Sequence, residues 1–170
     1  LHSLAGASGF RRRRINGKID FMKVTYSIAA KLGGGGIGTT SFQAVSGIER
    51  AGLLKRVYAD DYNSERVGLP LRQKLISTHA SIIERLPFVP QNYQWLIKDY
   101  LHDFLVARQL IPSSIFHGWN GHCTETLRKA RQLGAVTVVE RASSHPETYE
   151  IILKEEYRHW NLPLRPILPI

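Results

Sequence analysis

A run of glycines near the start of the chain has the composition of a phosphate-binding loop. Four consecutive glycines, residues 33–36, follow an apolar, β-rich segment, 24–30, and precede a segment typical of a helix, 41–51. Glycine lets the backbone approach an anion closely, and the N–H groups and positive dipole end of a helix start attract that anion. The same glycines would also suit a plain tight turn. The residues we expect to face a phosphate are Gly34, Gly35 and Gly36.

The glycine run also fits the G-x-G-x-x-G pattern of a dinucleotide-binding loop. Gly33, Gly35 and Gly38 occupy the three glycine positions of that pattern. Asp60 and Asp61 follow at about the distance of the acid that binds a ribose hydroxyl. In a run this rich in glycine, the match is partly automatic. No G-K-[ST] closes the run, which excludes a Walker A loop, and the chain has no G-x-S-x-G nucleophile elbow.

A second polar group lies in the segment Ile-Phe-His-Gly-Trp-Asn-Gly-His, residues 115–122. His117 and His122 can donate hydrogen bonds to oxyanions or hydroxyl groups, Asn120 adds an amide, and Trp119 offers an apolar platform for a sugar. Alternatively, the histidines only cap a strand end or a helix start. A metal site needs a further ligand that the sequence does not indicate, so we expect no metal.

A third polar group, Glu-Arg-Ala-Ser-Ser-His-Pro, occupies residues 140–146. Arg141, Ser144 and His145 together would suit an anion or a polyol. Ser143 and Ser144 would equally suit the start of the helix that follows, and the two interpretations are compatible.

The apolar pattern predicts strands and helices in alternation. The expected strands are 23–30, 54–59, 114–116 and 135–139, and the expected helices are 40–51, 124–132 and 146–160. We expect Thr39 or Thr40 to be the N-cap of the first helix. Alternating strands and helices predict a doubly wound α/β fold, with a mainly parallel sheet and helices on both of its faces.

Two consecutive helices are expected between the second and third strands. The first would end at Pro87 and would be marked by Leu71, Leu75, Ile82 and Leu86. The second would turn one apolar face toward the core. The residues of that face are Leu96, Ile97, Tyr100, Leu101, Phe104 and Leu105.

The predicted strands bring the polar groups to one edge of the sheet. The glycine loop, Asp60–Asp61, 117–122 and 141–145 all follow the carboxyl end of a predicted strand. Ligands of doubly wound sheets bind outside these carboxyl ends. This convergence predicts a binding site there.

Composition limits the classes of partner. The chain has 170 residues, a net charge of +9 and a single cysteine, Cys123, which excludes an intrachain disulfide. Residues 1–21, with Arg11–Arg14, are expected to be a leader or an appended segment before Met22. We expect no nucleic-acid binding, because these arginines have no interleaved aromatic residues. Anionic small ligands or an acidic membrane surface account better for the remaining charge, and we expect a cytoplasmic protein, at the inner face of a membrane if membrane-bound.

Three motifs together resemble the N-terminal domain of GT-B glycosyltransferases, most closely the retaining group that includes glycosyltransferase family 4. They are the glycine loop after the first strand, the H-x-W-N-x-H segment after a later strand, and E-R-A-S-S-H-P-E-T-Y-E-I-I-L-K-E-E-Y before a helix. The similarity covers about residues 22–170. It implies a Rossmann-like, acceptor-side domain, with a separate C-terminal domain that binds the nucleoside-diphosphate sugar and is absent from these residues.

The resemblance also implies roles for individual residues. The glycine loop, residues 34–36, would face the donor diphosphate across a cleft, and His117 would lie near the reacting sugar. His122, Arg141 and His145 would line the acceptor side, to which the residue types add Trp119, Asn120 and Ser144. The co-substrate would be a nucleoside-diphosphate sugar, without a further cofactor, and the partner would be a hydroxyl-bearing acceptor.

Two other functions fit the residues. An NAD(P)-binding Rossmann domain would use Gly33, Gly35, Gly38 and Asp60. Against it, the two consecutive predicted helices interrupt the simple strand–helix rhythm. A non-catalytic sugar- or anion-binding module would use the same loop without turnover.

Overall fold

The chain folds around a five-stranded parallel sheet. The computed structural model describes residues 22–85, 90–144 and 146–163. The strand order is β3-β2-β1-β4-β5, and every neighbouring pair is parallel. This is the doubly wound, Rossmann-like fold expected from the sequence, with its topological switch point between β1 and β4. The strands are β1 (Val24–Leu32), β2 (Leu54–Tyr62), β3 (Leu75–Ser77), β4 (Ile115–Trp119) and β5 (Val136–Glu140).

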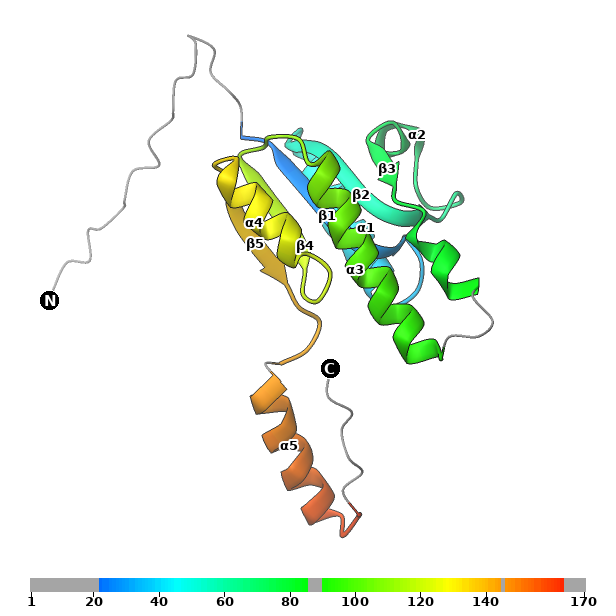
Figure 1. Cartoon of the computed structure of the whole chain (residues 1–170), viewed down its shortest axis with the longest axis vertical. Coiled ribbons are helices and arrows are strands. Elements are labelled where there is room, and N and C mark those ends of the chain that lie inside the picture. Colours follow the sequence, from blue (N-terminus) through cyan, green and yellow to red (C-terminus); the bar gives the residue numbers. More distant parts are fainter. Residues whose placement is uncertain (1–21, 86–89, 145, 164–170) are drawn as a thin grey trace, which may run out of the picture.

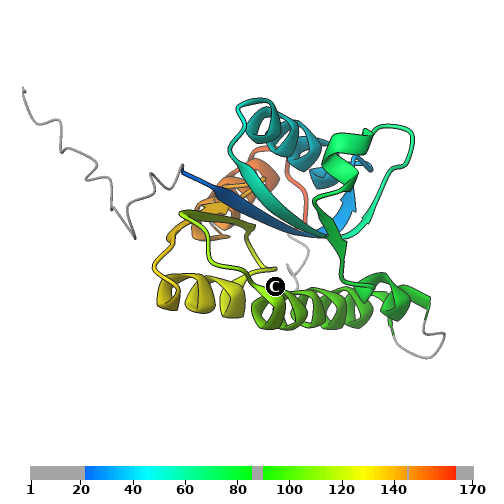
Figure 2. The ribbon, with the colours of Figure 1, turned by 90° about the horizontal axis from the view of Figure 1, so that it is seen from above.

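Helices cover both faces of the sheet. Helix α1 packs on one face, and helices α3 and α4 lie side by side on the other (Figure 2). Helix α5 lies apart from the sheet (Figure 1). The helices are α1 (Ile37–Arg50), α2 (Leu69–Arg72), α3 (Gln91–Gln109), α4 (Thr124–Gln132) and α5 (Pro146–His159), with a 3-10 helix, η1 (Ala80–Arg85).

Strand β1 forms the centre of the core, and its successive side chains serve opposite faces. Tyr26 and Ile28 pack with Val45 of α1 in the main apolar cluster. Ser27, between them, contacts His102 of α3 instead. Because strand side chains alternate, adjacent residues of β1 meet different helices.

Helix α1 begins earlier than the sequence predicts. Its N-cap is Gly36, at φ 55°, so the prediction of Thr39 or Thr40 as the cap is wrong. The hydroxyl of Thr39 instead donates a hydrogen bond to the carbonyl oxygen of Gly34, at 2.5 Å. The helix N-terminus therefore lies directly beside the glycine run.

The helix predicted before Pro87 does not form. The segment divides into α2, β3 and η1, and Leu86 lies outside the described residues. Leu71 packs in the core, whereas Leu75 pairs with Val57 of β2 as the first residue of β3. A three-residue strand forms because β2 offers its backbone edge, which no local periodicity reveals. The rhythm argument against a dinucleotide-binding domain therefore no longer applies.

The side of helix α3 that packs against the core is not the one predicted from the sequence. His102, Asp103 and Val106 are buried, whereas Tyr100 and Phe104 are exposed. Polar residues face inward because each has a partner there. These buried bonds outweigh the tendency of the apolar stripe to face the core.

The carboxylate of Asp103 joins α3 to α4. It accepts hydrogen bonds from the backbone N–H groups of Glu125 and Thr126, at 2.7 and 2.8 Å, and from the hydroxyl of Thr126 at 2.6 Å. A carboxylate at a helix start satisfies free N–H groups and complements the helix dipole. This cap holds the two helices as one layer.

Candidate functional site

The glycine loop combines one tight turn with one close helix–strand contact. Gly33 has φ +75°, and its N–H donates to the carbonyl oxygen of Gly38 at 2.9 Å. A Cβ on Gly38 would lie 2.3 Å from the carbonyl oxygen of Lys31. The first glycine is needed for its backbone conformation, and the last is needed for the packing of α1 against β1.

The middle of the loop is open to solvent. A Cβ built on Gly35 or Gly36 would meet no atom within 4 Å. In the described part of the chain, the N–H groups of Gly33, Gly34 and Gly38 have backbone acceptors, whereas those of Gly35, Gly36 and Ile37 have none. Three adjacent N–H groups at a helix start form a cradle for an anion.

Two cations lie beside this loop. The Arg66 guanidinium is 3.3 Å from the carbonyl oxygen of Gly33, and Arg66 is exposed. The ammonium of Lys31 lies 3.6 Å from the carboxylate of Asp61 on β2. An arginine at the rim would add charge-assisted hydrogen bonds to a bound phosphate.

A cluster of polar side chains extends from α1 across the sheet; we call it the Tyr26 cluster. Trp119 donates its indole N–H to Tyr26 Oη at 2.6 Å, and Tyr26 lies 2.7 Å from Glu140 Oε2. Ser41 Oγ is 3.2 Å from the same phenol oxygen. Ser41 is four residues into α1, about 6 Å along the helix from its start. The cluster therefore begins one helical turn from the glycine loop. Its members are Tyr26, Ser41, His117, Trp119 and Glu140.

His117 is the partly exposed end of the Tyr26 cluster. Its ring centroid is 4.7 Å from that of Tyr26, and its Nε2 lies 3.2 Å from Glu140 Oε2 without hydrogen-bond geometry. The side chains of His117 and Glu140 are 20% and 24% exposed. Desolvation lowers the pKa of His117, against the opposing effect of the Glu140 carboxylate. Burial raises the pKa of Tyr26 above its ordinary value, so its phenol remains a proton donor.

A second polar cluster lies on the opposite face of the sheet, beneath α3; we call it the His102 cluster. His102 Nδ1 is 2.7 Å from Asp60 Oδ1, and His102 Nε2 is 3.0 Å from Ser27 Oγ. Thr78 adds a hydroxyl 2.9 Å from the same carboxylate oxygen, and Lys98 Nζ lies 3.7 Å from Asp60 Oδ2. The cluster connects β1, β2 and α3 with the segment after β3.

The His102 cluster has the order of contacts of a hydrolytic triad, but it is closed to substrate. Ser27 is 1% exposed and His102 is fully buried. A nucleophile must reach a substrate carbonyl, which the packing of α3 on β1 prevents. The carboxylate of Asp60 is also unable to bind a ribose, because it is buried against His102 and Thr78. Asp61 is the exposed acid of the pair.

The structure separates the residues predicted after the third strand. His117 is not in a loop, because β4 extends to Trp119. Trp119 is buried in the core, so the prediction that it forms a sugar platform is wrong. His122 turns toward α3, with its Nε2 3.3 Å from Asp99 Oδ2. Asn120 is exposed, and its backbone N–H donates to the carbonyl oxygen of Glu140 at 2.9 Å.

The residues predicted after β5 lie at the surface. Arg141 and Ser144 are exposed, and Arg141 Nε is 3.4 Å from Ser143 Oγ. His145 lies outside the described residues. Their role in acceptor binding stays a prediction.

Seven residues of the two clusters had no role in the sequence interpretation. They are Tyr26, Ser41 and Glu140 of the Tyr26 cluster, and Ser27, Thr78, Lys98 and His102 of the His102 cluster. A tyrosine and a serine inside apolar strand and helix patterns are weak signals of a functional site, because periodicity does not distinguish them from ordinary packing residues. Glu140 gave a clearer signal, since an acid at the carboxyl end of a parallel strand lies at the ligand-binding edge.

The described residues include no group of three or more His, Cys, Asp or Glu side chains that could hold a metal ion. None of their helices is long and apolar enough to cross a lipid bilayer. Burial raises the pKa of Cys123 to about 12, so its thiol is a packing group and a poor nucleophile. No protein-family model, curated protein or solved structure matches the chain.

Proposed function

We propose that this chain is the acceptor-side half of a retaining glycosyltransferase that moves a sugar from a nucleoside-diphosphate sugar to an acceptor hydroxyl. The observation that supports this most is the glycine loop, whose N–H groups at Gly35, Gly36 and Ile37 have no backbone acceptor among the described residues. They lie at the carboxyl edge of a parallel sheet, where doubly wound folds bind phosphate ligands.

In the proposed reaction, the bond between the anomeric carbon and the diphosphate oxygen breaks, and a bond to the acceptor oxygen forms on the same face of the sugar. The diphosphate leaves with the bonding electrons, and the acceptor hydroxyl gives its proton to an oxygen of the departing diphosphate on the same face. N–H groups of the loop and Arg66 would stabilise the negative charge that develops on the departing diphosphate. Most donor contacts would come from a second domain, and transfer takes place in the cytoplasm.

The Tyr26 cluster is the proposed sugar-facing part of the site. His117 Nε2 is a buried atom 3.2 Å from Glu140 Oε2, whereas 20% of the His117 side chain and 24% of the Glu140 side chain are exposed. An imidazole and a carboxylate that are partly exposed suit hydroxyl groups, which both donate and accept. Arg141 and Ser144 would extend this surface toward the acceptor.

A dinucleotide-binding domain is the second candidate, and two observations favour it. One is the strand order 3-2-1-4-5, and the other is the glycine set: Gly33 has a positive φ, Gly35 has open space around it, and Gly38 lies close to β1, as expected of a nicotinamide cofactor domain. The burial of Asp60 argues against it, because the ribose would have only Asp61, which is 3.6 Å from Lys31. A non-catalytic sugar- or anion-binding module would use the same loop.

Titration calorimetry on the 170-residue chain tests the proposal. We expect weak or undetectable binding of uridine diphosphate glucose and guanosine diphosphate mannose. In an NMR titration with the same ligands, chemical-shift changes should be confined to the amides of residues 33–38. Micromolar binding of a nucleotide sugar would mean that the donor site is misplaced. Micromolar NADH binding would favour the dinucleotide-binding domain.

A glycine variant tests the same loop in a protein that also carries a donor-binding domain. Gly35→Val fits the open space around Gly35 without a clash in the fold, but its side chain would occupy the place of the diphosphate. We expect sugar transfer to fall about 10²-fold, the effect of losing a preorganised charge-stabilising contact. The matched control is Gly47→Val, which also has no atom within 4 Å but lies inside α1. Equal activity of the Gly35 variant at equal folding would contradict the proposal.

A further inference from the structure

The outer face of α3 carries an apolar stripe that the fold leaves in solvent. Its five residues recur every three or four positions, so they lie along one side of the helix. All are exposed, Leu96 by 65% and Tyr100 by 68%. A continuous exposed apolar surface of this kind marks an interaction site. The stripe consists of Tyr93, Leu96, Ile97, Tyr100 and Phe104.

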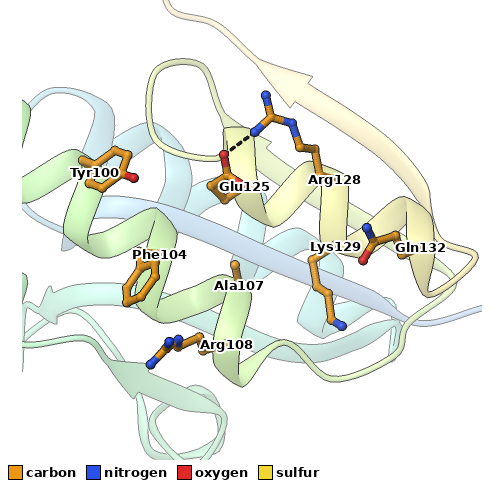
Figure 3. A pocket seen from close by; sticks show the side chains of 8 residues that line it. All are labelled: Tyr100, Phe104, Ala107, Arg108, Glu125, Arg128, Lys129 and Gln132. Atoms are coloured by element: carbon orange, nitrogen blue, oxygen red, sulfur yellow. Dashed lines mark hydrogen bonds and ion pairs between the residues drawn. The ribbon is translucent and has the colours of Figure 1, made fainter.

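An open groove of about 640 Å³ runs between this stripe and α4 (Figure 3). Tyr100, Phe104 and Ala107 of α3 form its apolar side. The guanidinium of Arg108 lies over the ring of Phe104, 4.4 Å from the ring centroid. The remaining lining residues come from α4 and are Glu125, Arg128, Lys129 and Gln132.

The groove has an excess of positive charge. Arg108, Arg128 and Lys129 line it, against the single acid Glu125, which is paired with Arg128. Apolar residues on one helix and cations on its neighbour therefore border the same groove.

We propose that the outer face of α3 and α4 docks onto a membrane surface rich in anionic phospholipids. Helices α3 and α4 lie side by side in one layer, so the stripe and the cations meet a flat surface together (Figures 1 and 2). Tyrosine and aliphatic side chains enter the boundary between headgroups and acyl chains, and cations nearby attract anionic headgroups. This binding requires no sugar transfer, so it stands or falls separately from the proposed function.

Co-sedimentation with lipid vesicles tests this surface. Every protein compared carries Arg11→Ser, Arg12→Ser, Arg13→Ser and Arg14→Ser, so that the N-terminal arginine run does not contribute. We expect binding to vesicles of phosphatidylcholine mixed with phosphatidylserine, and little binding to phosphatidylcholine alone. Added salt should weaken the binding, because it screens attraction between exposed charges.

Two variants separate the apolar and the charged contributions. Tyr100→Ser with Phe104→Ser should lower vesicle binding about tenfold or more, since two large apolar side chains no longer leave water. Lys129→Gln should lower it about fivefold, the contribution of one cation at an anionic surface. The matched control is Ile151→Ser with Ile152→Ser, two exposed apolar residues of α5. Circular dichroism checks that each variant is folded.

Several results would overturn the proposal. The first is equal binding to both kinds of vesicle, and the second is no vesicle binding at all. The third is a loss of binding in the α5 variant while the α3 variant binds as strongly as the wild type. Light scattering in the absence of lipid provides a further test. A dimer that the α3 variant abolishes would identify the stripe as an interface between two copies of this chain and would also overturn the proposal.

Discussion

The two polar clusters differ in access to solvent, although both begin at adjacent residues of one strand. Tyr26 makes a hydrogen bond to Glu140 and a ring contact with His117, and the side chains of these two residues are about one-fifth to one-quarter exposed. Ser27 joins His102 and Asp60, which α3 covers almost completely. The strand is the same, and only the face of the sheet differs.

This comparison shows that a constellation of reactive residue types is not by itself a site. The His102 cluster has a serine, a histidine and an aspartate in hydrogen-bond order, yet no ligand can reach it. Its bonds hold α3 against the sheet. The Tyr26 cluster has less familiar chemistry, but its His117 and Glu140 side chains are partly exposed, and it begins one turn from the glycine loop. Access, rather than residue type, favours the Tyr26 cluster as the functional one.

The largest expected effect is on the His102 cluster. His102→Ala removes the nearest side-chain partner of a buried carboxylate, so Asp60 would keep the Thr78 hydroxyl and the more distant Lys98. We expect the free energy of unfolding to fall by about 3–5 kcal/mol, because a buried carboxylate loses a hydrogen-bond partner and the missing ring leaves a cavity. Urea denaturation followed by circular dichroism measures this change.

Asp61→Asn is the control for His102→Ala, because Asp61 lies on the same strand and its ion pair with Lys31 is exposed. We expect it to change stability by less than about 1 kcal/mol, as for other surface pairs. A similar loss in both variants would mean that the buried contact between His102 and Asp60 contributes no more to stability than an exposed ion pair.

A smaller effect is expected at the centre of the Tyr26 cluster. Tyr26→Phe keeps the ring but leaves the indole N–H of Trp119 buried without its acceptor. We expect a loss of about 1–3 kcal/mol of stability. Tyr62→Phe is the matched control, since the Tyr62 ring contacts Arg72. If Tyr26→Phe were as stable as wild type, Tyr26 would not organise this cluster.

The smallest effect is a pH dependence at His117. Because the fold lowers the pKa of His117, this side chain becomes protonated in the unfolded chain below about pH 6.5 and stays neutral in the folded chain until the pH is lower. The stability due to neutral His117 is therefore complete above that pH and falls as the pH falls toward the lowered pKa. Denaturation of wild type and His117→Gln at pH 7.5 and about 5.5 should show a smaller fall in the variant, by up to about 1 kcal/mol.

The matched control is His159→Gln, the same substitution at an exposed histidine of α5. A pH dependence unchanged by His117→Gln, but reduced by His159→Gln, would mean that His117 is not desolvated by the fold.

Most of the sheet could be predicted from the sequence, but β3 could not. The apolar runs that became β1, β2, β4 and β5 are each recognisable from their own residues, and the boundaries moved by only a few positions. Strand β3 has three residues and exists through its pairing with β2. Leu71, Leu75 and Ile82 have the spacing of a helix, yet they belong to three different elements. Periodicity describes one element at a time and cannot show this.

The candidate site divides in the same way. The sequence placed the glycine run between a strand and a helix, and the structure puts the run beside the start of α1. The sequence did not indicate that Glu140 would contact Tyr26. The two residues are far apart in the chain, and they come together only because β4 pairs with both β1 and β5.

The sequence by itself determined most of the alternation of strands and helices and the position of the glycine loop, because these depend on local periodicity and on glycine conformation. Only the tertiary structure decided which side of each element is buried. On α3, the apolar stripe faces solvent because His102 bonds to Asp60 and Asp103 bonds to Thr126, partners distant in sequence. A buried polar group must be satisfied wherever its partner lies, and that requirement is settled by the whole fold rather than by neighbouring residues.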